Sequence, residues 1–299
     1  MLVYRKSPGR KIFLACTYTG LILLTIVCLL PFLHLLAISL SSADKANAGL
    51  VGLWPEEFTL KAYEYVLGTV KFPRAFGYSL IRVALGTVIG MTVTVLTAYP
   101  LSKSAKQLKG RGFFVAYFFI TAFFSGGLVP TYMVLNELEL LDTVWSLVLP
   151  NAAIFFNIIL MVNFFRSIPK GMEEAAIVDG ASQFTILFRI YLPVSKAGLA
   201  TLLLFIIVFH WNSWFDGLIY MNSPDKYPLQ SYLSTLILPI NVNMLHGADG
   251  SSAAGLLRVL SEKSIKAANV FLGALPIMLV YPFLQKYFIK GLMLGSLKE

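Results

Sequence analysis

The chain has 299 residues, of which 57% are hydrophobic and 13% are charged, and its formal net charge is +9. Soluble domains carry roughly 25% charged residues, so this composition excludes an ordinary soluble protein and indicates a membrane protein. An excess of positive charge also suits nucleic-acid binding, but here the basic residues cluster between apolar runs, which is typical of membrane orientation.

Six apolar stretches are long enough to cross the hydrocarbon core of a bilayer, which takes about 20 helical residues. The first is uncharged from Ile12 to Ala43, far longer than the apolar core of a cleaved signal peptide, so we expect an uncleaved anchor. The sequence therefore predicts an all-α membrane protein with six transmembrane helices, over residues 12–38, 77–101, 112–135, 144–166, 198–221 and 267–289.

Glycine and proline punctuate three of these stretches. Proline is tolerated in a membrane helix where neighbouring groups satisfy the freed carbonyl, so such breaks suit either a bundle that rocks or simple packing geometry. We expect interruptions at Gly126, Gly127 and Pro130 in the third stretch, at Pro150 at the start of the fourth, and at Pro276 and Pro282 in the sixth.

The charges between the stretches set the expected orientation, because segments rich in lysine and arginine stay in the cytoplasm. Residues 103–111 (KSAKQLKGR) form a short, purely basic segment. With the N-terminus inside, the cytoplasmic segments hold fifteen basic residues against four acids, and the outer segments hold eight against ten. We therefore expect a bacterial inner-membrane protein with both termini cytoplasmic.

Two long segments are then expected outside, over residues 41–76 and 222–266. The first should contain a short helix from Leu60 to Leu67. The second passes through a polar, glycine-rich tract that is too long for a plain connector, although a flexible linker is the alternative. Its polar side chains include Asn241, Asn243, His246 and Asp249.

Residues 169–196 lie between the fourth and fifth stretches and have the pattern of a helix–turn–helix. Glu173 and Glu174 fall near a helix start, where the macrodipole favours negative charge. Gly180 offers the left-handed conformation that ends a helix. The segment is therefore expected to fold, although it connects two membrane spans.

The second helix of this segment is expected to start at Ser182, a favourable N-cap residue. Apolar residues recur at helical spacing as far as Ile190, and Pro193 should prevent clean continuation. The result is an apolar face presented to water, which a soluble partner could bury. The alternative is an amphipathic hairpin lying on lipid.

The spacing of these residues resembles the EAA signature of ABC importer permeases. Glu174-Ala175-Ala176 is followed after three residues by Gly180 and, after nine more, by Ile190-x-Leu192-Pro193. In that family the segment seats in a cleft of the ATPase subunit. The resemblance therefore implies a set of ATPase-coupling residues: Glu173, Glu174, Ala175, Ala176, Asp179, Gly180, Ile190, Leu192 and Pro193.

The resemblance covers nearly the whole chain. Residues 124–132, 210–220 and 287–295 are similar to the carbohydrate-importer branch, within which the chain resembles the smaller permease of the maltose system and permeases for alginate or pectin fragments. This implies an ABC importer permease (MetI-like) fold with its core at 75–290, after a first segment, 1–74, and before a cytoplasmic tail, 291–299. By resemblance to the maltose system, the tail from Leu294, with the cation Lys298, is expected to reach the ATPase interface, and a frayed terminus is the alternative. The same resemblance implies that Asn241, Asn243, His246 and Asp249 contact the extracytoplasmic binding protein.

The sequence contains no sign of its own energy source. It has no Gly-Lys dipeptide, so the phosphate loop of an ATPase is missing, and ATP with its Mg²⁺ would have to bind to partner subunits. The spans hold few acids, which disfavours an ion-driven carrier. Arg82 and Asp216, near the outer ends of two spans, are each expected to snorkel toward water. No catalytic, cofactor or metal constellation is recognised, so we expect a non-catalytic chain.

Polar and aromatic side chains within the spans are candidates for a substrate path. Aromatic faces together with amide and hydroxyl groups suit sugar rings. Tryptophan also gathers at membrane interfaces, and polar groups also join membrane helices to one another, so packing is the alternative interpretation. The candidate path residues are Asn151, Asn157, His210, Trp211, Asn212, Ser213 and Trp214.

The expected function is that of a permease subunit of an ATP-driven importer for oligosaccharides. The family implies a sister permease, two ATPase subunits and an extracytoplasmic solute-binding protein, and it implies no nucleic acid. The alternatives are an ABC permease for a non-sugar solute, a stand-alone channel or carrier, and a membrane scaffold without transport activity.

Overall fold

The computed structural model describes residues 8–237 and 262–296, and within these residues every regular element is helical. The predicted contacts at Asn241, Asn243, His246 and Asp249, and the cation Lys298, lie outside this part of the chain. The chain divides into two compact units, Met1–Val70 with Leu236–Ala274, and Lys71–Thr235 with Leu275–Glu299.

The smaller unit is built from α1 (Pro8–Ser39), α2 (Ala43–Asn47), α3 (Lys61–Gly68) and the beginning of α16 (Glu262–Ser296). Most of α1 is apolar and exposed on all sides, as expected of a helix surrounded by lipid. Its C-terminal end packs Ala37 against Ala46 and Val51. The short helix predicted over residues 60–67 is confirmed as α3.

The predicted interruption of the last stretch is wrong, because α16 continues through Pro276 and Pro282 to Ser296. A proline removes one backbone donor, and membrane helices tolerate this loss where other groups satisfy the freed carbonyl.

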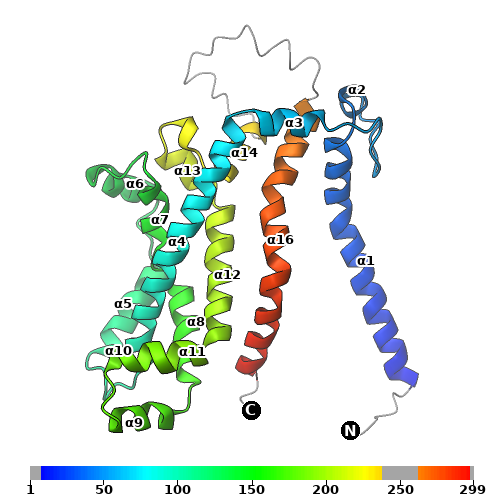
Figure 1. Cartoon of the computed structure of the whole chain (residues 1–299). Helices are drawn as coiled ribbons and strands as arrows, with labels where there is room; N and C mark the ends of the chain where they lie inside the picture. Colours follow the sequence, from blue (N-terminus) through cyan, green and yellow to red (C-terminus); the bar gives the residue numbers. More distant parts are fainter. Residues whose placement is uncertain (1–7, 238–261, 297–299) are drawn as a thin grey trace. The chain divides into compact units, whose positions relative to one another are not determined.

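The larger unit is organised around α4 (Lys71–Ser102), which is 32 residues long and unbroken. Helices α8 (Phe155–Arg166) and α12 (Lys196–Asn212) pack along it and against each other (Figure 1). Their contact surface forms an apolar core that includes Ala98, Met161 and Leu202.

Glycine allows these helices to approach closely, as small residues do in membrane bundles. A Cβ atom added to Gly86 of α4 would lie 2.3 Å from Nε2 of His210 on α12. One added to Gly198 of α12 would lie 2.5 Å from the ring of Phe164 on α8. In both places an aromatic ring of one helix therefore packs directly against the backbone of its neighbour.

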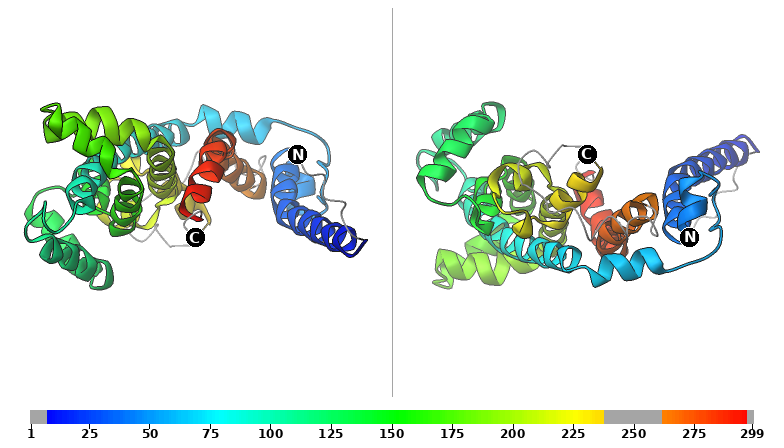
Figure 2. Two further views of the ribbon diagram at one scale, coloured as in Figure 1. Left: turned by 90° about the horizontal axis from the view of Figure 1, so that it is seen from below. Right: turned by 90° about the horizontal axis from the view of Figure 1, so that it is seen from above.

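The remaining helices of the larger unit are α5 (Arg111–Phe123), α6 (Leu128–Glu137), α7 (Val144–Val148), η1 (Leu149–Asn151), α9 (Lys170–Val178), α10 (Gln183–Ile186), η2 (Leu187–Tyr191), α11 (Leu192–Val194), α13 (Phe215–Tyr220), η3 (Pro224–Lys226) and α14 (Leu229–Ile237). Both end-on views in Figure 2 show α5 with α6, and separately α9 with α10, reaching away from the bundle of α4, α8 and α12.

In the described part of the chain, three helices are long and apolar enough to cross a membrane unbroken: α1, α4 and residues 262–280 of α16. Up to six spans result if each bent helix pair forms one span, in agreement with the predicted number. The pair α5–α6 bends by 112° across the predicted break at Gly126 and Gly127. The pair α7/η1–α8 bends by 50° after Pro150, which lies in η1.

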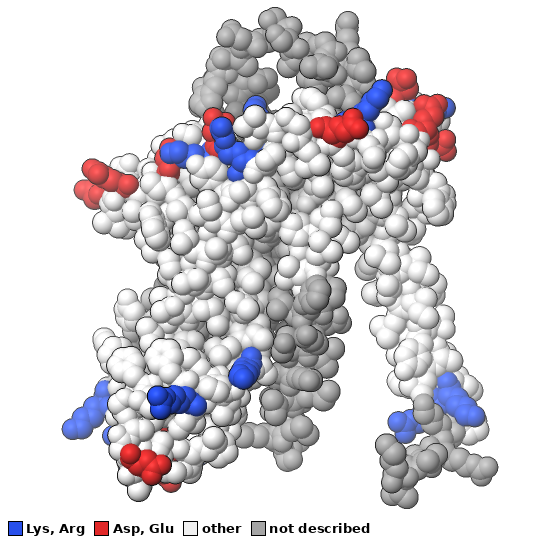
Figure 3. Space-filling view, in the orientation of Figure 1, with Lys and Arg blue, Asp and Glu red and all other residues white. Residues whose placement is uncertain are grey.

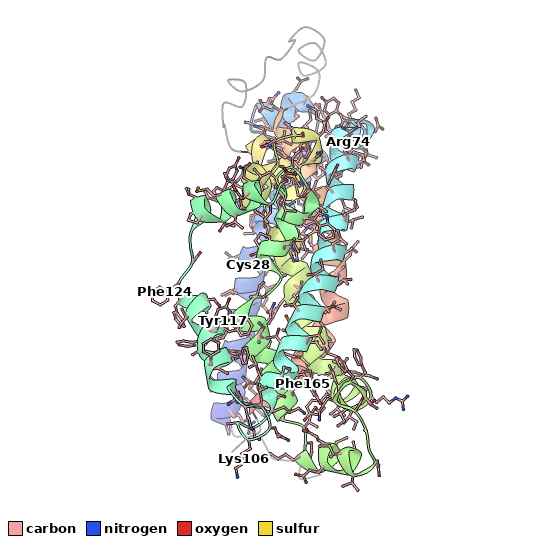
Figure 4. All side chains as sticks on the ribbon, turned by 90° about the vertical axis from the view of Figure 1, so that its left-hand side faces the viewer. Cys28, Arg74, Lys106, Tyr117, Phe124 and Phe165 are labelled. Carbon is pink, nitrogen blue, oxygen red and sulfur yellow. The ribbon has the colours of Figure 1, made fainter. Side chains whose placement is uncertain are left out.

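Charged side chains of the larger unit collect at its two ends on the face drawn in Figure 3, and the band between them is uncharged. Figure 4 shows Arg74 at one end of α4, Lys106 beyond the other end, and Phe165 near the Lys106 end. This distribution is typical of a protein whose middle faces lipid.

At the Arg74 end, Asp142 connects the segment before α7 to residues 220–226 through hydrogen bonds and an ion pair. Its carboxylate accepts hydrogen bonds from the backbone N–H groups of Asn222 and Ser223, at 3.1 and 3.0 Å, and pairs with Nζ of Lys226 at 2.5 Å. Its own N–H donates to the carbonyl of Tyr220. Asp142 has a φ of 60°, a left-handed conformation that Asp tolerates better than most residues.

Candidate functional site

The segment 169–196 folds as the predicted helix–turn–helix, which we call the hairpin. Its first helix, α9, ends in a Schellman motif: the N–H of Ala181 donates to the carbonyl of Ala176, and the N–H of Gly180 donates to that of Ile177. Gly180 has a φ of +77°, as this motif requires. Ser182 then caps α10 by accepting a hydrogen bond from the N–H of Thr185.

The second arm of the hairpin differs from prediction at its end. A π-helical turn, η2, lets the N–H of Leu192 donate to the carbonyl of Leu187, and the helix continues through Pro193 to Val194. The wider π-turn accommodates the proline ring, which a regular turn would exclude. The chain changes direction after Val194, where the axes of 183–194 and α12 meet at 83°.

The structure divides the predicted coupling residues into two groups. Glu173 and Ala176 are buried, and Ile190 and Leu192 pack partly buried against the apolar core. The others face outward: Glu174, Ala175, Asp179, Gly180 and Pro193. One group therefore holds the shape of the hairpin, and the other is free to contact a partner.

Buried Glu173 forms an ion pair with Lys103, which follows the last residue of α4. The carboxylate lies 2.8 Å from Nζ, and both side chains are 9% exposed. The hydroxyl of Tyr191 in η2 donates to the second carboxylate oxygen at 2.6 Å and accepts from Lys103 at 3.1 Å. The ammonium also lies 4.1 and 4.2 Å from the ring centroids of Tyr99 and Tyr191. We call these four residues the latch.

In the latch, burial disfavours the charged forms of Lys103 and Glu173, and the interaction between the two residues opposes this effect. Burial lowers the pKa of Lys103 below its ordinary value, against the opposing effect of Glu173. Burial raises the pKa of Glu173, but hydrogen bonds from Lys103 and Tyr191 outweigh it, so the net shift is downward. Sequence reasoning missed the latch, although the basic residues directly after α4 and the acids of the hairpin were both visible.

The outer surface of the hairpin carries large exposed apolar side chains among its charged ones. Val178 is 87% exposed and Phe184 69% exposed, and Ile177 and Phe188 are also exposed. A cavity of about 740 Å³ opens between this surface and the end of α4, lined by apolar residues that include Leu96 and Leu187 and by the latch residues Tyr99, Lys103 and Glu173. Exposed aromatic and aliphatic side chains of this kind mark an interaction surface.

The structure also divides the candidate path residues into a group that lines a groove and a group that is buried. A groove of about 470 Å³ is lined by Asn151, Asn212, Ser213 and Trp214, among others. It follows the break between α12 and α13, which interrupts the fifth stretch where continuous helix was predicted. The structure does not bring the remaining three candidates to this groove, because Asn157, His210 and Trp211 are buried.

The expectation that Arg82 and Asp216 snorkel separately toward water is wrong. Arg82 is fully buried, and its two terminal nitrogens bind both carboxylate oxygens of Asp216. The guanidinium also donates to the carbonyl of Ser213, at 3.2 Å. In an apolar environment, mutual pairing satisfies both charges at once, and the pair fixes the backbone of the break that lines the groove.

In the described part of the chain, no group of three or more His, Cys, Asp or Glu side chains is placed to hold a metal ion. The two features that remain are the exposed hairpin toward one end of α4 and the groove toward the other, which is largely apolar and includes a few polar side chains. The arrangement can dock a soluble protein and offer polar groups to a solute.

Comparison with known proteins agrees with this arrangement. No protein-family model matches the chain. It is 38% identical to protein LplC of Bacillus subtilis over 98% of this chain and 97% of that protein. It is 35% identical to the polygalacturonan/rhamnogalacturonan transport system permease protein YtcP of the same organism, over 96% and 99% of the two chains.

Among solved structures, the chain is similar to a bacterial ABC transporter involved in the import of the acidic polysaccharide alginate. The TM-score is 0.86 at 31% identity, over 96% of this chain and all of that one. Together with the relatives, this likeness establishes the all-α permease fold. The chain belongs to the family of ABC transporter permeases, in the branch that holds the permeases of sugar and polysaccharide importers, and it is an integral membrane protein.

Proposed function

We propose that the hairpin couples this permease to a separate ATPase subunit. The observation that carries the proposal is that the hairpin exposes Val178 and Phe184 while its inner side is fixed to α4 through Lys103 and Glu173. A soluble partner can dock on an exposed apolar surface. Because the inner side of the hairpin is fixed to α4, movement of such a partner would be transmitted to the bundle. Glu174 and Ala175 would contact the ATPase, and the buried signature residues would hold the surface in shape.

The proposed substrate is an oligosaccharide, in particular a fragment of a plant or algal polysaccharide. This rests on the substrates named for YtcP and for the alginate transporter, both similar to this chain throughout their length. The groove offers amides from Asn151 and Asn212, the hydroxyl of Ser213 and the aromatic face of Trp214. Such groups match the hydroxyls and C–H faces of sugar rings.

The proposed assembly contains a sister permease, two ATPase subunits that hold ATP and Mg²⁺, and an extracytoplasmic binding protein that delivers the saccharide. This chain itself carries no catalysis in the proposal. The contacts of Asn241, Asn243, His246 and Asp249 with the binding protein, and the reach of the tail toward the ATPase interface, stay predictions. The division into segments 1–74, 75–290 and 291–299 is also kept as a proposal.

The proposed orientation places both termini and the hairpin in the cytoplasm of a bacterium. The short basic segment 103–111 supports it, because lysine and arginine favour the cytoplasmic side. In this orientation the hairpin faces ATP, and the groove lies toward the side on which the binding protein arrives.

Co-expression with the sister permease and the ATPase, followed by reconstitution in liposomes, tests the proposed function. We expect the ATPase to copurify with this chain, and saccharide uptake to require ATP and the loaded binding protein. Uptake that continues without the ATPase subunits would contradict the proposal and favour a stand-alone carrier.

A further inference from the structure

Two ion pairs of the larger unit stand apart by their burial. Lys103–Glu173 has both side chains 9% exposed, and Arg82–Asp216 has an arginine that is fully buried. The other two ion pairs in the described part of this unit, Arg74–Asp225 and Lys226–Asp142, are considerably more exposed. Each buried pair takes its cation from α4 or from the residue that follows it.

The two pairs are fixed to one rigid element, with Arg82 in the first half of α4 and Lys103 directly after its last residue. Residues 82 and 102 belong to the same unbroken helix, and at 1.5 Å per residue they are about 30 Å apart, close to the thickness of the hydrocarbon core. Between them, a Cβ atom added to Gly90 of α4 would lie 3.4 Å from the side chain of Ile206 on α12, and Gly86 leaves room for the ring of His210. This close packing resists bending of α4 in its middle.

The inner pair grips both arms of the hairpin. Glu173 lies on α9, Tyr191 lies on η2, and both bind Lys103. The hydroxyl of Tyr99, within α4 itself, also donates to the side-chain oxygen of Gln183 on α10 at 2.8 Å. A displacement of the hairpin therefore cannot leave α4 behind without exposing or separating buried charges, which is unfavourable.

The second pair, Arg82–Asp216, holds the break between α12 and α13 beside the groove. Arg82 binds the carboxylate of Asp216 and the carbonyl of Ser213, and Asp216 also accepts a hydrogen bond from the N–H of Gly217. These residues lie at the end of α12 and the start of α13, where the helix is interrupted. Movement of α4 would thus be passed directly to Ser213 and its neighbours along the groove.

We propose that α4 is the lever that carries movement of the hairpin to the groove, with Lys103 and Arg82 as the positioning residues that fasten it to the hairpin and to the groove. The inference rests on the proposed function in one respect, namely that an ATPase moves the hairpin. It adds the route of transmission and the two residues that fasten it. Both residues act through other groups and contact neither ATP nor substrate.

The test measures transmission by a reporter in the groove of the reconstituted complex. Phe215→Cys, in a chain whose Cys16 and Cys28 are replaced by alanine, places a thiol on the groove lining. Its rate of modification by a maleimide is compared between the nucleotide-free complex and the complex trapped with ATP and vanadate. We expect the two rates to differ in the parent chain; equal rates there would overturn the inference, because the groove would not respond.

Substitution of Lys103 then separates docking from transmission. We expect the difference in labelling to disappear in Lys103→Met complexes that still contain the ATPase. Loss of the ATPase from this variant would show instead that Lys103 serves docking, and would overturn its role in transmission. Lys103→Arg should retain the difference, and Lys103→Glu combined with Glu173→Lys should restore it. Coupling of this kind usually amounts to about 5- to 150-fold, so stimulation of the ATPase by the loaded binding protein should fall by about tenfold or more.

The controls keep this outcome distinct from failure of the proposed function. Lys106→Met removes an exposed charge from the same basic segment and should change neither labelling nor stimulation. Arg82→Gln should abolish the labelling difference with the ATPase still bound. A Lys103→Met or Arg82→Gln complex that keeps the full labelling difference overturns the lever. Loss of ATPase binding already in the parent chain would instead contradict the proposed function.

Discussion

Tyr191 lies 18 residues after Glu173 in the sequence, and its hydroxyl donates a 2.6 Å hydrogen bond to the Glu173 carboxylate. This bond joins the two arms of the hairpin from inside, while the turn at Gly180 joins them along the chain. The hairpin is thus closed at two places, and its outward residues keep a fixed spacing.

Tyr191→Phe should loosen the hairpin without emptying its core. The ring contacts with Tyr99 and Phe165 remain, but one oxygen of Glu173 loses its donor. A hydrogen bond to a charged group contributes about 1.5–3 kcal/mol, so we expect a lower unfolding temperature and faster proteolysis of 169–196. Tyr117→Phe, at an exposed site on α5, is the control and should behave like the parent. Equal proteolysis of both variants would contradict this role for the hydroxyl.

Gly180→Val should distort the turn of the hairpin. No atom lies within 4 Å of the added Cβ, so the effect comes from the left-handed backbone alone and should cost about 1–2 kcal/mol. We expect loss of saccharide uptake and of substrate-stimulated ATPase activity, with insertion into the membrane unchanged. Gly171→Ala, also with open space but on α9 at an ordinary φ, is the matched control. Normal uptake and normal ATPase stimulation in Gly180→Val would show that the turn is not needed for coupling.

Val178→Glu and Glu174→Lys should weaken binding of the ATPase. Both positions are exposed on the hairpin, so neither change disturbs its buried side. Val178→Glu places a charge in an apolar interface, where it would have to be desolvated without a partner. Glu174→Lys reverses the charge that the partner would meet on the same surface. Copurification measures the effect, and Lys106→Glu, a charge reversal on the neighbouring segment, should leave it intact. Retention of the ATPase by both hairpin variants would point to another docking surface.

The junction at Asp142 should open as the pH falls. Burial raises the pKa of Asp142, but hydrogen bonds from Lys226 and Ser223 outweigh it and hold the pKa below its ordinary value. Because the folded pKa is depressed, the stabilisation is present above the unfolded value of about 4 and is lost as pH falls through the folded one. Limited proteolysis across pH 3–6 should show this loss in the parent but not in Asp142→Asn, which is open throughout. Glu137→Gln, an exposed neighbour, should follow the parent; a parent profile without pH dependence would contradict the assignment.

Cysteine labelling should report the proposed orientation. In a chain whose Cys16 and Cys28 are replaced by alanine, an impermeant maleimide added outside should modify Glu137→Cys and spare Lys106→Cys. Permeabilised cells provide the control, in which both react. The reverse pattern would place the hairpin outside and remove it from any contact with a cytoplasmic ATPase.

Local signals made the hairpin predictable. Gly180 and Ser182 act within a few residues of their own positions, and hydropathy alone locates most of the spans. The continuation of the helix past Pro193 was not predictable, because a proline is read as a stop and a single π-turn has no sequence signature of its own.

The latch and the pair Arg82–Asp216 could not be predicted from local pattern. Arg82 and Asp216 are 134 residues apart, and Lys103 and Tyr191 are 88 apart. A lone charge near the end of a span fits snorkelling as well as pairing, and only the packing of α4 on α12 decides between them. Burial likewise decided which candidate path residues reach the groove.

The close approach of His210 to Gly86 limits which substitutions the two positions can accept during evolution. A Cβ at 86 would overlap the imidazole ring, so no alanine can arise there while the ring keeps its place. A smaller residue at 210 would lift that restriction and leave a gap that a side chain at 86 could fill. Across related permeases, the two positions should therefore change together, glycine persisting wherever a ring faces it.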